Sequence, residues 1–147
     1  MNLKEQLQSD LKDAMRANDS LRKNTLRMAI SAIKLAEIEK NTSLDDPAVL
    51  AVLQKEVKSR REAIADAQHA NRPDLIQSAE QEIALLEHYL PKAFDPAELE
   101  TLARQAIQEA SASSLKEMGQ VMKILMPRLQ GRATGDQASQ VVRKLLA

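Results

Sequence analysis

The sequence contains no cysteine and no tryptophan, and it has a single tyrosine, Tyr89, and a single phenylalanine, Phe94. The lack of cysteine excludes disulfide bonds, thiolate nucleophiles and cysteine-ligated zinc. With so few aromatic rings, any core must be built from aliphatic side chains. No apolar run is long enough to span a membrane. Because the first residues are polar, with no apolar segment behind them, we expect a cytoplasmic protein without a membrane partner.

Charge is balanced over the whole chain but not along it. The chain has 21 Lys and Arg against 21 Asp and Glu, whereas residues 116–147 hold 6 basic residues against 2 acidic ones. This excess is too small for a strong non-specific binder of nucleic acid. It is enough for a local patch that contacts anions.

Apolar residues recur at spacings of three and four almost throughout, which predicts an all-α protein. Loops are expected at residues 18–20, 41–47 and 71–74, where Asn, Asp, Ser and Pro gather. Two prolines, Pro91 and Pro96, exclude a continuous helix between them. We therefore predict an N-terminal four-helix unit over residues 1–90 and a compact C-terminal three-helix unit over residues 91–147.

Capping signals predict where several helices begin. Asp46 before Pro47 and Asp95 before Pro96 have the pattern of an N-cap followed by proline in the first turn. Two capping boxes are expected, from Ser114 with Glu117 and from Thr134 with Gln137. The basic residues of 55–62, and the row of Arg22, Lys23, Arg27 and Lys34, are expected to be solvated and largely self-paired.

All three glycines lie between residues 119 and 135, and none occurs elsewhere. Gly119 lies in a predicted helix over residues 115–129, with Lys116 and Lys123 about one turn before and after it. A backbone without a side chain between two ammonium groups would admit a phosphodiester, but it would equally admit a crossing helix. One broad apolar face is predicted for this helix, and it is expected to serve as core or as a partner groove. Its members are Leu115, Met118, Met122, Leu125, Met126 and Leu129.

The loop that follows this helix has two interpretations. Gly131 is expected just beyond the C-cap, with Pro127 kinking the helix or limiting its last turn. Gly135 precedes the last helix, whose N-terminus favours anions, and Arg128 and Arg132 are close by in the sequence. Ordinary capping explains the same residues, so a phosphate site and a plain helix start remain alternatives.

The sequence offers little for catalysis. His69 and His88 lack partners at the spacings that metal ligands need, and no nucleophile stands beside a base in a known motif. We therefore expect no catalytic residues, no metal and no cofactor.

Several segments, taken together, resemble the YqeY family: residues 26–40, 52–61, 86–92, 118–122 and 131–135. That family is similar to the helical tail domain of the GatB subunit of the glutamine-dependent aspartyl/glutamyl-tRNA amidotransferase, a carbon–nitrogen ligase with glutamine as amido donor. The resemblance implies a four-helix unit followed by a three-helix unit, whose glycine-bearing segment meets the elbow of tRNA. The candidate RNA contacts are Lys116, Gly119, Met122, Lys123, Arg128, Gly131, Arg132 and Gly135.

The resemblance carries over no catalytic residue, because the chemistry of the amidotransferase belongs to other subunits and domains. It implies a non-catalytic module that contacts tRNA or tRNA-like RNA, as an accessory to amidation or to other proteins of tRNA metabolism. The alternative is a protein-interaction module that uses the methionine face as a groove. An enzyme in its own right is the third possibility.

Overall fold

The computed structural model describes residues 1–147, which form seven α-helices, one short 3-10 helix and no strand. The expectation of an all-α fold is confirmed. The chain divides into two compact units, Met1–Leu90 and Pro91–Ala147. No helix is both long and apolar enough to cross a membrane.

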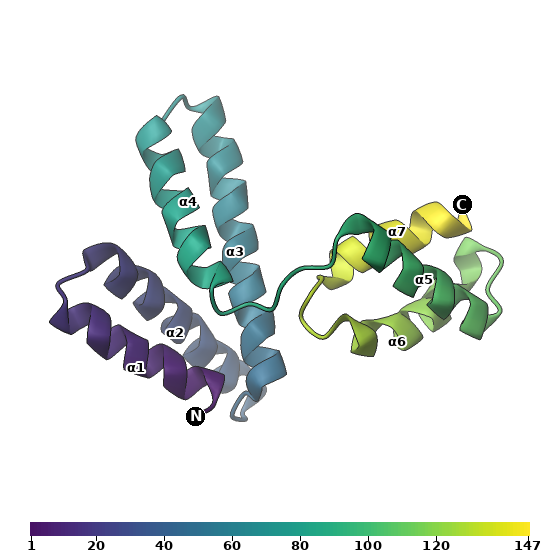
Figure 1. Cartoon of the computed structure of the whole chain (residues 1–147), viewed down its shortest axis with the longest axis horizontal. Coiled ribbons are helices and arrows are strands. Elements are labelled where there is room, and N and C mark those ends of the chain that lie inside the picture. The colour runs from purple at the N-terminus through teal and green to yellow at the C-terminus, as the bar shows by residue number, and fades with distance from the viewer. The chain divides into compact units, whose positions relative to one another are not determined.

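The first unit consists of two helical hairpins (Figure 1). Helices α1 (Leu3–Arg16) and α2 (Ser20–Lys40) form one, and α3 (Asp46–His69) and α4 (Pro73–Glu87) form the other. Helix α2 also packs on α3 and α4, so one aliphatic core serves all four helices. That core comprises Leu7, Ala14, Leu26, Ala29, Ile30, Ile33, Leu44, Val49, Leu53, Val57, Ile83 and Leu86.

Asparagine takes the place of glycine at the helix ends of this unit. Asn18, Asn41 and Asn71 have φ values of 53°, 51° and 54°, each just after a helix. Asparagine tolerates this left-handed conformation better than other non-glycine residues. Residues 1–90 can therefore turn three times without a glycine.

The predicted start of α3 was wrong by one residue. Asp45, not Asp46, is the N-cap, and its carboxylate accepts a hydrogen bond from the backbone N–H of Ala48 at 3.0 Å. Asp46 instead accepts the N–H of Leu3 at 3.0 Å, which ties the start of α1 to the start of α3. A contact between residues this far apart in the chain cannot be read from local sequence.

The pair Glu56 and Arg60 forms as predicted, at 2.8 Å, but the expectation of a solvated pair was wrong. Only 7% of Arg60 is exposed, and its Nε also donates to Glu82 of α4 at 2.9 Å. A buried guanidinium needs such partners to offset its loss of water. Arg60 therefore links α3 to α4.

The second unit packs α5 (Pro96–Ala110) against both α6 (Met118–Leu129) and α7 (Gly135–Leu146), with the 3-10 helix η1 (Leu115–Glu117) before α6. Asp95 with Glu98 and Thr134 with Gln137 form complete capping boxes, which confirms the start of α7 predicted from sequence. The core comprises Leu99, Ala103, Ala106, Val121, Leu125, Leu129, Ala133, Ala138, Val142 and Leu146.

The capping box predicted from Ser114 and Glu117 is not formed. Ser114 makes no side-chain cap bond, and residues 115–117 form a 3-10 turn instead. The Glu117 carboxylate accepts the backbone N–H of Ser113 at 3.2 Å, which is one residue earlier than a capping box requires. Helix α6 consequently begins at Met118.

Candidate nucleic-acid interface

Helix α6 is rotated relative to the apolar face expected from the sequence. Val121, Leu125 and Leu129 are its buried residues, at the four-residue spacing of one face. Met118 and Met122 pack partly buried against the same core, whereas Leu115 and Met126 are 49% and 46% exposed. The predicted face was therefore wrong at two of its six positions and missed Val121. The 3-10 turn causes part of this difference, because it takes Leu115 out of the register of α6.

Gly119 lies in the first turn of α6, on the side that faces solvent. A Cβ atom built on it would meet nothing within 4 Å outside its own helix backbone. No helix of the second unit crosses at Gly119, so the close-packing explanation fails within that unit. The glycine leaves a stretch of helix backbone that an outside molecule can approach.

Lys123 is exposed on α6 one turn after Gly119, and Lys116 is exposed in the preceding 3-10 turn, three residues before Gly119. Neither ammonium group makes a hydrogen bond or an ion pair in the fold. Gln120 is exposed beside them. We call Gly119, Gln120 and Lys123 of α6, together with Lys116 of η1, the outer face of α6. This face combines free positive charge with an unobstructed backbone.

Arg128 is on α6 but is already engaged. Its guanidinium forms a two-pronged pair with the carboxylate of Glu109 on α5, with one of the two hydrogen bonds at 3.0 Å. The hydrogen bond from Arg128 lowers the pKa of Glu109, and the same bond raises the pKa of Arg128. Arg128 thus joins α5 to α6.

Arg132 has contacts that the sequence did not indicate. Its guanidinium lies over the ring of Phe94, 4.0 Å from the centroid, and its Nε donates to the carbonyl of Lys92 at 2.9 Å. Its Nη2 lies 3.3 Å from the carboxylate of Glu98. In the backbone, the N–H of Phe94 donates to the carbonyl of Arg132 at 3.0 Å. Arg132 therefore fastens the loop after α6 to the segment before α5.

The two glycines that follow α6 differ in what they do. Gln130 and Gly131 have φ values of 50° and 75°, so the helix ends in the left-handed conformation, and the expectation for Gly131 is confirmed. Gly135 is the first residue of α7, and a Cβ there would lie 3.3 Å from the terminal methyl of Met126. The Met126 side chain therefore covers Gly135.

The eight predicted contacts thus separate into three groups. Lys116, Gly119 and Lys123 come together on the outer face of α6. Met122 is half-buried in the core, and Arg128 and Arg132 bind other parts of the same unit. Gly131 shapes the loop, and Gly135 begins α7 beneath the Met126 side chain.

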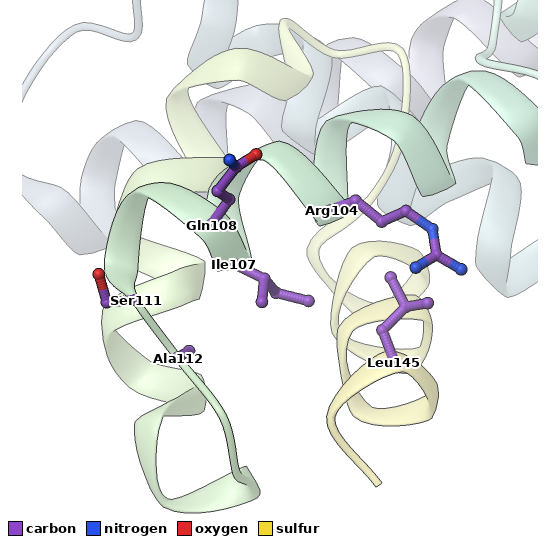
Figure 2. Close-up of a pocket in the computed structure, with 6 residues that line it drawn as sticks. All are labelled: Arg104, Ile107, Gln108, Ser111, Ala112 and Leu145. Atoms are coloured by element: carbon purple, nitrogen blue, oxygen red, sulfur yellow. The ribbon is translucent and has the colours of Figure 1, made fainter.

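The unit also has a shallow hollow between the end of α5 and the end of α7, with a volume of about 450 Å³ (Figure 2). Ile107 reaches into it from α5, and Leu145 faces it from α7. Arg104 at its rim is paired with Glu100 at 2.7 Å. The lining of the hollow, which also includes Gln108 and Ser111, brings together no group of catalytic side chains. In the whole fold, no three His, Cys, Asp or Glu side chains lie close enough to hold a metal ion.

These features define a class of protein: an all-α module of two helical units, with a small cationic helix face in the second. Residues 4–146 match the family described as Yqey-like protein. The chain belongs to the YqeY family, as its motifs indicated.

Curated relatives are fungal proteins named altered inheritance of mitochondria protein 41, mitochondrial. The protein from Vanderwaltozyma polyspora is 35% identical over 106 residues, which cover 70% of this chain and 57% of that protein. The one from Kluyveromyces lactis is 40% identical over 84 residues, covering 56% and 45%. The one from Pyrenophora tritici-repentis is 29% identical over 130 residues, covering 86% and 71%.

The chain spans about half the length of the first two relatives. Their names place them in mitochondria, which differs from the cytoplasmic location expected for this chain. Those names specify neither a ligand nor a reaction.

Proposed function

We propose that the C-terminal unit binds tRNA or a tRNA-like RNA through the outer face of α6. The observation that carries the proposal is Gly119, whose open backbone lies between two lysines without partners. Glycine costs a helix up to about 1 kcal/mol relative to alanine. Because no contact within the second unit requires a glycine there, an external ligand would explain why this position lacks a side chain.

The chemistry of this face suits a phosphate backbone. Ammonium groups bind phosphates as point charges and fix the position of a nucleic acid without reading its sequence. No side chain caps the first turn of α6, whose N-cap residue is Glu117, so this end of the helix dipole lies next to Gly119 while the Glu117 carboxylate is engaged by Ser113. Two lysines and a helix start give modest affinity that depends on salt.

Within this proposal, the arginines and the loop glycine among the candidates hold the site in shape, and the lysines contact the RNA. Arg128 and Arg132 hold α5, α6 and the loop in place, and Gly131 allows the turn between α6 and α7. We therefore assign phosphate contact to Lys116 and Lys123. The resemblance to the amidotransferase tail domain supports tRNA as the RNA, in a cytoplasmic, non-catalytic accessory role beside the amidotransferase or other proteins of tRNA metabolism.

The alternative, a partner groove on the methionine face, has less support. Met118 and Met122 already pack against the core, and Met126 is the one methionine of α6 with a largely exposed side chain. A single exposed methionine above Gly135 does not line a groove.

The proposal is tested by titrating the full chain with a tRNA transcript at two salt concentrations. Lys116→Ala and Lys123→Ala should each weaken binding severalfold and reduce the slope of log K against log salt by about one. Lys55→Ala is the matched control, because Lys55 is an exposed lysine of α3 that makes no ion pair. Equal effects of all three substitutions, or no saturable binding by the unmodified chain, would refute the proposal.

A further inference from the structure

A second surface, in the first unit, has no part in the proposed RNA contact, and its polar contact with the fold is from Arg60 Nη2 to the sulfur of Met28 at 3.8 Å. Met28, Leu35 and Ile38 on α2 are 56%, 58% and 75% exposed. Spacings of seven and three residues put them along one side of the helix, over a rise of about 15 Å. Ser31, also exposed, lies among them. We call Met28, Ser31, Leu35 and Ile38 the apolar strip of α2.

The apolar strip does not adjoin the buried face of α2. The buried residues of α2 include Leu26, Ala29, Ile30 and Ile33, which lie on the opposite side of the helix. Three large apolar side chains on the solvent side of one helix form an unusual cluster, because exposed hydrophobic residues are normally scattered. A cluster of this kind marks a surface that another molecule covers.

The charges beside the strip indicate the chemistry of that molecule. Arg27 and Lys34, seven residues apart, border the strip on one side and are exposed, as expected, but they make no ion pair in the fold, so the expectation of self-pairing was wrong for these two residues. Of the carboxylates at this end of α2, Glu37 is occupied by Lys4 at 2.7 Å and by the N–H of Leu44 at 2.9 Å. Glu39 is exposed on the opposite border of the strip. This border therefore presents two cations that nothing within the chain neutralises.

At the end of α2 the surface continues into an open hollow of about 620 Å³. Ile38 and Lys34 line it together with Asn41 and Thr42 of the following loop. The strip, its cationic border and the hollow thus form one continuous surface with apolar and positive components.

We propose that this surface docks an amphipathic helix of a partner protein that carries Asp or Glu along one flank. Apolar residues spaced by three, four and seven would cover Leu35, Ile38 and Met28, and acidic residues would pair with Arg27 and Lys34. This interaction is separate from the proposed RNA contact, which uses residues of the other unit. It would give the module a second, protein-binding function.

Two other occupants suit the surface less well. A second copy paired in the antiparallel sense would set Arg27 and Lys34 against the same residues of its partner, and like charges there repel. A membrane surface is usually met by helices with aromatic anchors and many basic residues. The apolar strip has no aromatic side chain and only two free cations beside it.

Photo-cross-linking from the centre of the strip tests the proposal. Ser31→p-benzoylphenylalanine in the full chain, expressed in its own cells, should yield an adduct whose cross-linked segment is identified by mass spectrometry. The expected segment has apolar residues at helical spacing and Asp or Glu on one flank. Gln77→p-benzoylphenylalanine, on the exposed side of α4, is the matched control position.

Charge variants give the decisive comparison. Arg27→Glu combined with Lys34→Glu should reduce the adduct at least tenfold, whereas Arg27→Lys combined with Lys34→Arg should keep it. A synthetic peptide of the mapped segment with its acidic residues changed to lysine should restore binding to the Glu variant. Circular dichroism should show that both variants keep their helical content, because both side chains are exposed.

Any of four results would overturn the proposal: an adduct with a second copy, an adduct with RNA, a mapped segment without acidic residues, or no adduct above the control. A vesicle assay gives one more such outcome, in which the chain floats with phosphatidylserine vesicles and loses this co-flotation in Leu35→Ser. That result would also overturn the proposal and would identify the strip as a membrane-binding surface. Loss of tRNA binding would leave this proposal untouched, since the two surfaces share no residue.

Discussion

The guanidinium of Arg132 stacks on the ring of Phe94 at 4.0 Å, although 37 residues separate the two in the chain. The same side chain donates to the carbonyl of Lys92 and faces the carboxylate of Glu98. One arginine thus closes the second unit by joining its first segment to its last loop. Arg132 therefore stabilises the folded second unit, whether or not it contacts RNA.

We expect Arg132→Ala to lower the free energy of unfolding of the second unit by about 1 to 2 kcal/mol, because it removes a cation–π contact and a charged hydrogen bond. Arg132→Lys should recover little, since an ammonium cannot both stack and reach the Lys92 carbonyl. Urea titrations measure both. The control is Arg104→Ala, which breaks an exposed pair with Glu100 and should cost about 0.5 kcal/mol or less. Equal losses from Arg132→Ala and Arg104→Ala would contradict this account.

Two neighbouring positions should respond to substitution in opposite directions. Gly131 has a φ of 75°, so Gly131→Ala should cost about 1 kcal/mol through backbone strain. Gln130 has a φ of 50° without being glycine, so Gln130→Gly should stabilise the chain by up to about 1 kcal/mol. Melting temperatures of Gly131→Ala and Gln130→Gly, each compared with the unmodified chain, measure the two changes in stability. The same sign of change for both would show that the end of α6 adopts another conformation.

The single tyrosine gives an optical test of the first unit. Burial, and next the hydrogen bond to Asp10 at 2.5 Å, raise the pKa of Tyr89 well above its usual value near 10. In the native chain the absorbance of tyrosinate at 295 nm should therefore appear at higher pH than in urea. Because the folded pKa is the raised one, this contribution to stability is complete below about pH 10 and is lost as the pH rises further. Asp10→Asn should lower the native midpoint, and coincident titrations in native and urea-unfolded chain would contradict the contact.

Local sequence signals predicted much of the fold. The periodicity of apolar residues gave the helical class, and Asp95 and Thr134 marked the starts of α5 and α7 through hydrogen bonds that span only three residues. These features depend on neighbours in the chain, so a single sequence contains them.

The rest depends on contacts between distant residues. The loss of Leu115 from the buried face follows from a 3-10 turn that local propensity does not distinguish from a first helical turn. The contacts of Arg128 with Glu109 and of Arg132 with Phe94 join elements that are 19 and more residues apart, so both arginines looked free in the sequence. Conversely, the open space at Gly119 depends on how the other helices of the unit pack, which the sequence does not state. Within the candidate site, the sequence indicated the right helix and its lysines but not the state of the arginines.

The most direct test of the central claim is Gly119→Ala, measured for tRNA affinity and for melting temperature in the same preparation. If the outer face of α6 admits an RNA backbone, the added methyl should weaken tRNA binding severalfold. Because a Cβ at this position meets nothing in the chain, the same change should raise the melting temperature by roughly 2–4 °C. Affinity and stability would then move in opposite directions. A lower melting temperature with unchanged tRNA binding would contradict the account.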